Sequence, residues 1–389
     1  MEKLYGYRRK KLEETTSQFF RYKYADIHWN NQMLALVGPR GVGKTTLFLQ
    51  HIKRHHSLDN TLYVVADQHF FSEHSLLELA ERFSQNGGQY LFIDEIHKYD
   101  GWSRELKEIY DSYSDLHVYF TGSSILEIEK GDADLSRRVP KYEMQGLSFR
   151  EFLRIRHHIK TPVFSLEQIV NHKVETPNIK HPLPLFREYL RNGYYPFGHD
   201  IDFDIELEQV INRTMEVDIP QYANMNVSTG RKLKKLLIEI SKNSPFKPNM
   251  TTLGQVIGAS RNNIEDYLCY LEKAGMIGQL RDDTGGIRGV GKVEKVYVDN
   301  TNLMFNLGHG FENIGNIRET VFYNQMRVNH DVIASKTADF TIGKKIFEVG
   351  GKNKGQRQIA TIEEGYIVKD DIEYGYGNVI PLWHFGLNY

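Results

Sequence analysis

The sequence contains little cysteine, no long apolar segment and almost no net charge. One cysteine in 389 residues excludes an internal disulfide, and the amphipathic helical pattern around Cys269 predicts a buried, reduced thiol. No apolar run approaches the roughly 18 residues that suggest a membrane-spanning helix. The first residues also lack the apolar core of a signal peptide. We therefore expect a cytoplasmic protein with no membrane partner.

Acidic and basic residues nearly cancel. The 49 Lys and Arg residues face 50 Asp and Glu residues, which leaves a net charge of −1. This balance excludes a globally basic nucleic-acid binder, although local basic patches can still exist. The length exceeds what one hydrophobic core usually supports, so we expect roughly two to four domains.

The most informative segment is a glycine-rich sequence that follows the apolar run 33–37. It satisfies the G-x-x-x-x-G-K-[ST] pattern of a phosphate-binding loop, with a predicted strand before it and a predicted helix after it. Inward-pointing backbone amides, the ammonium of Lys44 and the hydroxyl of Thr45 predict binding of ATP and Mg²⁺. The predicted ATP-binding residues are Gly38, Pro39, Arg40, Gly41, Val42, Gly43, Lys44, Thr45 and Thr46.

A second motif ends the segment 89–93 in two carboxylates, Asp94 and Glu95. It resembles a Walker B element, in which Asp94 would hold Mg²⁺ through water and Glu95 would polarise the attacking water. Lys44 and Glu95 are therefore the predicted catalytic residues. Thr45 and Asp94 are the predicted metal-binding residues.

Other parts of this region leave alternatives open. The predicted strand 117–121 runs into Ser123, whose hydroxyl would either sense the γ-phosphate or belong to a plain polar turn. A regulator that binds nucleotide without hydrolysis is disfavoured by the presence of Glu95. A GTPase is also disfavoured, because residues 97–100 mimic the guanine-reading motif with a wrong first residue.

These motifs resemble the prokaryotic AAA-type ATPases, in particular an archaeal-type subgroup with a C-terminal winged helix and a nuclease-like domain. The resemblance is carried by residues 38–46, 92–98, 102, 106–111, 121–124, 131–138 and 146–153. It implies a parallel sheet in which the Asp94 strand is separated from the phosphate-loop strand by the sensor strand. It also implies an arginine finger or sensor at Arg137 or Arg138, whereas an arginine pair by itself suggests only solvated charge.

The element pattern divides the chain into four predicted domains. Strands and helices alternate over residues 1–155, which predicts an α/β phosphate-loop ATPase core with a parallel sheet. A helical lid or connector is predicted over residues 156–228. After it we expect a winged helix over residues 229–307 and a small α/β nuclease-like domain over residues 308–389.

The predicted winged helix consists of three helical segments and a hairpin. Its third helix would present Arg261, Asn262 and Asn263 at the end that reaches base edges in DNA-binding examples. The residues expected to meet phosphates are Arg281, Arg288, Lys292 and Lys295. Winged helices fused to AAA modules also contact proteins, and Asp282 and Asp283 dilute the charge, so DNA and a protein partner both remain candidates.

The C-terminal segment resembles the PD-(D/E)XK nuclease fold, with Glu319 opening a helix, Asp339 after it and Glu348 in a strand. Such nucleases bind Mg²⁺ through carboxylates and activate water with a lysine two residues after the second one. Gly350 stands at that position. Lys352 shares a face with Glu348 but starts roughly 13 Å away along a strand, and only a bulge would bring it closer. A non-cleaving domain is therefore favoured over an active nuclease.

A basic cluster in the same segment would accept a nucleic-acid backbone. Its members are Lys344, Lys345, Lys352, Lys354 and Arg357. The three carboxylates are expected to converge, with Lys352, Lys354 or a divalent ion relieving their repulsion. We expect an ATPase or ATP-gated switch that binds DNA, a protein partner or further copies of itself, with an ATP-regulated nuclease as the alternative.

Overall fold

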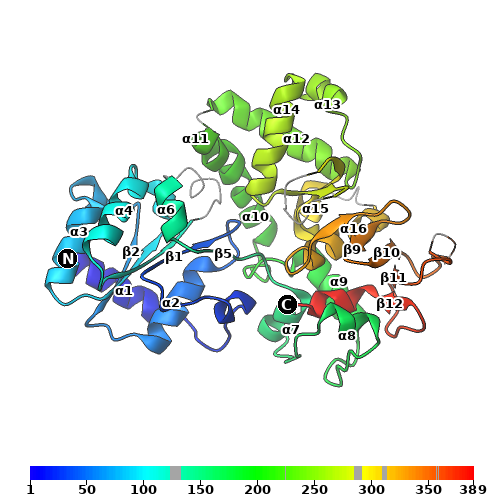
Figure 1. Cartoon of the computed structure of the whole chain (residues 1–389), viewed down its shortest axis with the longest axis horizontal. Helices are drawn as coiled ribbons and strands as arrows, with labels where there is room; N and C mark the ends of the chain where they lie inside the picture. The colour runs from blue at the N-terminus through cyan, green and yellow to red at the C-terminus, as the bar shows by residue number, and fades with distance from the viewer. Residues whose placement is uncertain (123–132, 224, 284–290, 309–312, 356, 358) are drawn as a thin grey trace. The chain divides into compact units, whose positions relative to one another are not determined.

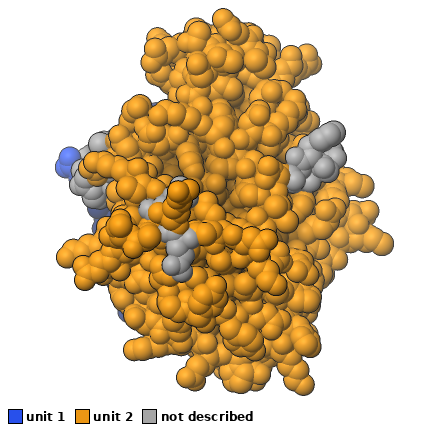
Figure 2. Space-filling model, turned by 90° about the vertical axis from the view of Figure 1, so that its right-hand side faces the viewer, with its two compact units in different colours: residues 1–146 blue, residues 147–389 orange. Residues whose placement is uncertain are grey.

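The computed structural model describes the chain except for residues 123–132, 224, 284–290, 309–312, 356 and 358 (Figure 1). The described residues form two compact units, unit 1 over residues 1–146 and unit 2 over residues 147–389, which Figure 2 colours separately. Among the helices described, none is long and apolar enough to cross a membrane.

Unit 1 is built on a five-stranded parallel sheet in the order β2-β3-β4-β1-β5. Its strands are β1 (Met33–Val37), β2 (Thr61–Val65), β3 (Tyr90–Asp94), β4 (His117–Thr121) and β5 (Lys141–Glu143). The first four strands are almost entirely buried, as expected for a parallel sheet with both faces covered. Strand β4 lies between β3 and β1, so the predicted separation of the Asp94 strand from the phosphate-loop strand is confirmed.

The helices of unit 1 cover both faces of this sheet (Figure 1). Alternate residues of β1 enter opposite cores: Met33 and Ala35 pack with α3 and α4, and Leu34 and Leu36 pack with α2. The elements are α1 (Glu2–Glu14), α2 (Lys44–His55), α3 (Leu76–Gln85), α4 (Trp102–Ser112), α6 (Ala133–Arg138), η1 (Tyr22–Ala25), η2 (His69–Ser72) and η3 (Ile96–Lys98).

Unit 2 begins with a helical region. Its helix α7 packs the rings of Phe149 and Phe152 against Tyr189, which is why unit 1 ends at Gly146 instead of at the predicted residue 155. The helices are α7 (Phe149–Arg156), α8 (Leu166–Val170), α9 (Pro182–Asn192), α10 (Phe203–Arg213), η4 (Thr214–Asp218) and α11 (Ile219–Ala223).

Three helices and a hairpin follow, in the order expected of the predicted winged helix. They are α12 (Val227–Asn243), α13 (Met250–Ile257), α14 (Arg261–Lys273), β6 (Ile277–Arg281) and β7 (Val293–Val298), with β6 and β7 antiparallel. The prediction that Cys269 is buried is wrong, because Cys269 is exposed. Ile264, Leu268 and Leu271 form the buried face of α14, and Cys269 lies away from that stripe.

The C-terminal part of unit 2 holds a second five-stranded sheet, in the order β12-β11-β10-β9-β8. Strands β8, β9 and β10 pair antiparallel, whereas β10, β11 and β12 pair parallel. Helix α16 packs Phe322 against Phe340 and Phe347 of this sheet, and it begins at Ile314 instead of at Glu319. The elements are α15 (Thr301–Gly308), α16 (Ile314–Met326), β8 (Val332–Ala334), β9 (Phe340–Ile342), β10 (Lys345–Gly350), β11 (Gly365–Lys369), β12 (Val379–Pro381) and η5 (Leu382–Leu387).

Candidate nucleotide-binding site

The phosphate loop connects β1 to α2 at the carboxyl edge of the parallel sheet. Gly38, Gly41 and Gly43 have φ angles of 148°, 83° and 97°, which residues with side chains rarely adopt. Gly43 is also the N-cap of α2. The loop therefore leads directly into the N-terminus of a helix, where free amides and the helix dipole attract anions.

The ammonium of Lys44 lies inside this loop. Its Nζ atom donates hydrogen bonds to the carbonyl oxygens of Gly38 at 2.9 Å and Pro39 at 2.7 Å. The side chain is buried. Phosphate oxygens at the loop would compete with these two carbonyls for the same protons.

Asp94 accepts hydrogen bonds from three hydroxyl groups. The hydroxyls of Thr45 and Tyr63 donate to Oδ2 at 2.7 and 2.8 Å, and the hydroxyl of Thr121 donates to Oδ1. Burial and the neighbouring Asp94 carboxylate raise the pKa of Tyr63, which keeps this phenol protonated as a donor. The predicted pair of Thr45 and Asp94 is thus in direct contact, and Tyr63 and Thr121 complete its surroundings.

Glu95 is held between two cations. Its Oε1 lies 3.3 Å from Nη1 of Arg40 in the phosphate loop, and its Oε2 pairs with Lys98. Burial alone would raise the pKa of Glu95, but the hydrogen bond from Lys98 and the charge of Arg40 outweigh burial and lower it. Glu95 is therefore ionised near neutral pH, in a backbone conformation with φ of 51° that few non-glycine residues adopt.

His97 lies beside the same charges, although it is not among the predicted site residues. Burial is the main cause that lowers the pKa of His97 to about 4. Glu95 opposes this shift, whereas Arg40, Lys44 and Lys98 reinforce it. The imidazole is consequently neutral near pH 7.

The remaining predicted residues do not join this group. Ser123 lies outside the described residues, and Arg137 is exposed. Nε of Arg138 lies 3.4 Å from Oδ1 of Asp111, near the last residue of α4, and its guanidinium lies 5.8 Å from the ring centre of Tyr110. Because a crossover helix runs back against its parallel strands, the end of α4 lies at the sheet edge opposite to the phosphate loop. This position does not favour Arg138 as a sensor of nucleotide in its own chain.

A second group of carboxylates gathers in unit 2. Nζ of Lys295 lies 2.8 Å from Oε2 of Glu319 and 3.1 Å from Oδ1 of Asp339. Burial and the charge of Asp339 raise the pKa of Glu319, and the charges of both residues add to the burial that raises the pKa of Glu348. The carboxylates of Glu319 and Asp339 thus share one cation, and the charges of both act on the carboxylate of Glu348. The convergence of all three at one site stays a prediction. Lys295, which was expected to meet phosphates, instead bridges two of them.

Lys354, and not Lys352, reaches Glu348. Lys354 forms an ion pair with Glu348, whereas Lys352 is exposed. A Cβ atom at Gly350 would lie 2.6 Å from Cγ of Lys354, so the Lys354 side chain occupies the space next to the position of the missing lysine. Within the described ranges, no group of three or more His, Cys, Asp and Glu side chains is arranged to hold a metal ion.

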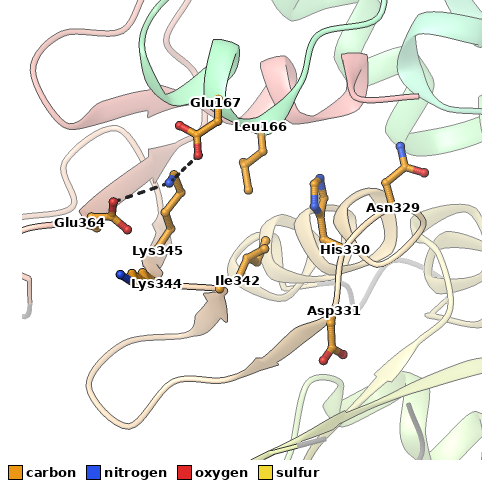
Figure 3. Close-up of a pocket in the computed structure, with 10 residues that line it drawn as sticks. Leu166, Glu167, Asn329, His330, Asp331, Ile342, Lys344, Lys345 and Glu364 are labelled. Carbon is orange, nitrogen blue, oxygen red and sulfur yellow. Dashed lines mark ion pairs between the residues drawn. The ribbon is translucent and has the colours of Figure 1, made fainter. Parts of the chain in front are cut away.

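The predicted basic cluster is partly neutralised by acidic neighbours. Figure 3 shows Lys345 between Glu167 and Glu364 at one end of a cavity of about 450 Å³. Nζ of Lys345 lies 2.7 Å from Oε1 of Glu167 and 3.8 Å from Oε1 of Glu364. Lys344 and Arg357 are exposed.

The predicted DNA-reading surface is also occupied by internal ion pairs. Arg261 pairs with Glu265 at 3.2 Å, and Nη2 of Arg281 lies 3.1 Å from Glu272. Nζ of Lys292 lies 3.1 Å from Oε1 of Glu294. Arg288 lies outside the described residues, and Asn262 and Asn263 are exposed at the start of α14.

The sheet order, the phosphate loop and the Thr45–Asp94 contact define unit 1 as a P-loop NTPase of mixed α/β fold. Residues 30–153 match a family model described as an AAA domain, and residues 183–308 match a model described as a domain of unknown function, DUF8612. The chain thus contains an AAA-type P-loop ATPase domain, which supports nucleotide binding.

Two proteins of Methanocaldococcus jannaschii are similar to this chain in sequence. The uncharacterized protein MJ1637 is 25% identical over 268 residues, which cover 63% of this chain and 56% of that protein. The uncharacterized protein MJ1544 is 24% identical over 347 residues, which cover 85% of this chain and 74% of that protein. The aligned part thus spans little more than half the length of MJ1637.

Two solved structures are similar to this chain at low TM-scores. The Walker-type ATPase Paby2304 of Pyrococcus abyssi is 13% identical with a TM-score of 0.46, over 76% of this chain and 97% of that chain. A RuvB variant of Thermotoga maritima is 13% identical with a TM-score of 0.32, over 72% of this chain and 89% of that chain.

Proposed function

We propose that the chain is a Mg²⁺-dependent ATPase, or an ATP-gated switch, that hydrolyses ATP in unit 1 and contacts a partner through unit 2. The observation that carries the proposal is the 2.7 Å hydrogen bond between Thr45 and Asp94, next to the helix N-terminus at the phosphate loop. A hydroxyl and a carboxylate are hard oxygen donors, which suit Mg²⁺.

The residues of the loop bind and orient the nucleotide in this proposal. Backbone amides of residues 38–46 and the ammonium of Lys44 hold the β- and γ-phosphates. Thr45 and Asp94 would hold the Mg²⁺ ion, which neutralises phosphate charge when it is bound. The donors on Asp94 from Tyr63 and Thr121 fix the orientation of that carboxylate.

Glu95 orients the attacking water and accepts its proton. An ionised carboxylate is required for this role, and the lowered pKa of Glu95 provides one. The same two cations that lower the pKa also occupy both carboxylate oxygens. We infer that these ion pairs fix the orientation of Glu95, whose remaining lone pairs can accept a hydrogen bond from water.

The proposal is tested by measuring ATP turnover by the full chain with Mg²⁺, and again with single-stranded or duplex DNA. Turnover that disappears in Lys44→Ala and Glu95→Gln supports it.

Arg137 is proposed to act in trans within a homo-oligomer, so Arg137→Ala should lower kcat while nucleotide affinity stays constant. Equal kcat in Arg137→Ala and the wild type would exclude the arginine finger.

For residues 229–307 we propose a winged helix that contacts a protein partner more readily than DNA. Arg261, Arg281 and Lys292 are paired internally, and the exposed face of α14 also carries Glu265 and Asp266. Phosphate contacts would have to break those ion pairs first. Fluorescence anisotropy with labelled DNA at several salt concentrations tests this: affinity that falls with salt and with Arg261→Ala would favour DNA.

For residues 308–389 we propose a nuclease-like domain that does not cleave, reached through a helical connector over residues 156–228. Lys295 and Lys354 neutralise the carboxylates that would otherwise attract a divalent ion. Incubation of plasmid DNA with the chain and Mg²⁺ or Mn²⁺ should give no nicking. Nicking that Asp339→Ala abolishes would instead establish the alternative, an ATP-regulated nuclease.

A further inference from the structure

The phosphate loop is tied to the segment through which the chain leaves unit 1. The buried guanidinium of Arg21 donates from Nη1 to the carbonyl of Val42, inside the loop. It donates from Nη2 to the carbonyl oxygens of Gln145 at 2.7 Å and Gly146 at 2.8 Å. Gly146 is the last residue of unit 1. One side chain thus joins the loop to residues 144–146, which we call the exit segment.

Further contacts join the same two segments. The amide of Met144 donates to the carbonyl of Val37, directly before the loop, at 2.9 Å. Gly38 approaches the exit segment so closely that a Cβ atom there would lie 2.1 Å from the Met144 carbonyl oxygen. Tyr22, which follows Arg21 and lies outside the loop, also binds the exit segment: its hydroxyl accepts a hydrogen bond from the amide of Gln145 at 3.1 Å. A displacement of the loop therefore changes the environment of the exit segment directly.

Lys44 connects these contacts to the phosphates of a nucleotide. Its ammonium donates to the carbonyl of Gly38, the residue that touches Met144, and to the carbonyl of Pro39. A bound phosphate draws the same ammonium toward itself, and Gly38 loses a hydrogen bond when that happens. The change in hydrogen bonding therefore begins at Gly38, the loop residue that contacts the exit segment.

Arginine is suited to span the two segments. Its planar guanidinium presents nitrogen donors in a fixed fork, so separate nitrogens can serve Val42 and the pair Gln145 and Gly146 at the same time. The ammonium of a lysine is a single point that cannot occupy both positions. Nothing in the phosphate-loop or Walker B motif indicates this role, since Arg21 stands 21 residues before Val42 and 124 before Gln145.

We propose that Arg21 is a positioning residue that couples nucleotide binding at the phosphate loop to the exit segment, and so to the connection with unit 2. The coupling rests on the proposed binding of ATP. Arg21 acts through the carbonyl of Val42. When the guanidinium of Arg21 is removed, the loop still binds nucleotide, but the exit segment no longer responds.

Hydrogen–deuterium exchange of the full chain, with and without Mg²⁺ and ADP or a non-hydrolysable ATP analogue, tests the coupling. In the wild type, nucleotide should slow exchange in residues 38–46 and change exchange in residues 143–148 by about twofold or more. In Arg21→Lys the protection of 38–46 should remain, while the change in 143–148 falls to less than half. Arg9→Lys, an exposed arginine of α1, is the matched control and should behave as the wild type.

The outcomes separate the coupling from the proposed function. A response of residues 143–148 that is as large in Arg21→Lys as in the wild type would overturn the coupling, as would no response in a wild type whose loop is protected. Absence of protection at residues 38–46 in the wild type would overturn ATP binding and the coupling together. Arg21→Ala should lose the response completely. If it does not fold, the comparison of Arg21→Lys with the wild type decides alone.

Discussion

Nη1 of Arg40 lies 3.3 Å from Oε1 of Glu95, so a residue of the phosphate loop holds the carboxylate proposed to activate water. Lys98, three residues after Glu95, forms an ion pair with the other carboxylate oxygen. The loop proposed to bind phosphate and the carboxylate proposed to activate water are therefore connected by an ion pair. Several experiments distinguish the contributions of these groups.

Replacement of Glu95 should separate binding from hydrolysis. Glu95→Gln removes the proton acceptor and the charge but keeps the size of the side chain, so ATP affinity should change little while kcat falls by about 100-fold or more. Lys44→Ala should lose ATP binding itself, because the loop loses its cation. Isothermal titration with ATP and a phosphate-release assay measure both effects. Wild-type turnover in Glu95→Gln would disprove the proposed base.

Replacement of Lys98 should move the pH dependence of hydrolysis. Burial raises the pKa of Glu95 and Lys98 lowers it, so in Lys98→Ala this pKa should rise. Since the base works only when it is ionised, the acid limb of the kcat/KM profile should shift to higher pH. Lys10→Ala, an exposed lysine of α1, serves as the control. An unchanged acid limb in Lys98→Ala would show that another group controls it.

Replacement of Tyr63 should weaken the metal site without removing a ligand. Tyr63→Phe deletes the hydroxyl that donates to Asp94 and leaves the ring in the core. Loss of a hydrogen bond to a metal-binding carboxylate commonly costs about tenfold or more in metal affinity. The Mg²⁺ concentration at half-maximal turnover should rise accordingly, whereas Tyr90→Phe in the neighbouring strand should leave it unchanged. The same Mg²⁺ dependence in Tyr63→Phe and the wild type would exclude this role.

Replacement of Lys295 should destabilise unit 2 in a pH-dependent way. Lys295→Met leaves the carboxylates of Glu319 and Asp339 without their shared cation. Because these two side chains are 19% and 16% exposed, the cost should be smaller than the about 3–5 kcal/mol of a fully buried charge. Burial and Asp339 raise the pKa of Glu319, and the loss of Lys295 raises it further. Below pH 4.5 Glu319 is protonated in both the folded and unfolded states, so it adds nothing there to the difference in unfolding free energy between Lys295→Met and the wild type. The contribution of Glu319 to this difference grows as pH rises through its folded pKa.

Urea unfolding at several pH values measures this dependence. The gap between Lys295→Met and the wild type should widen from pH 4 to pH 7. Lys292→Met changes an exposed lysine of the same strand region and should cost little at either pH. A deficit that is constant with pH would mean that Lys295 contributes only packing.

The sequence alone predicts those parts of the candidate site whose residues are neighbours along the chain. The phosphate loop and the strand ending in Asp94 and Glu95 are short segments whose residue order encodes their local geometry, and the contact of Thr45 with Asp94 follows from both. The hydroxyls of Tyr63 and Thr121 could not be assigned in the same way. They reach Asp94 because β2 and β4 flank β3, which no local pattern specifies.

Charged residues were harder to predict than apolar ones. Lys295 looked like a phosphate contact on a hairpin, yet its partners Glu319 and Asp339 follow 24 and 44 residues later. The helical pattern of mixed apolar residues around Cys269 predicts a buried thiol, although a shift of one residue on a helix changes the face. Ion pairs and exposure both depend on tertiary packing, which spacing along the chain does not reveal.

The bridge from Lys295 also has a consequence for how this chain can be divided. Its lysine belongs to the hairpin, before the predicted boundary at residue 307, and its two carboxylates come after that boundary. Arg327 and buried Asp299 pair across the same boundary, and the hydroxyl of Tyr323 donates to the carbonyl of Gln279. A truncated protein ending at residue 307 would expose these polar groups and the apolar surface around them. The hairpin and the C-terminal sheet should therefore be produced, purified and unfolded as one piece.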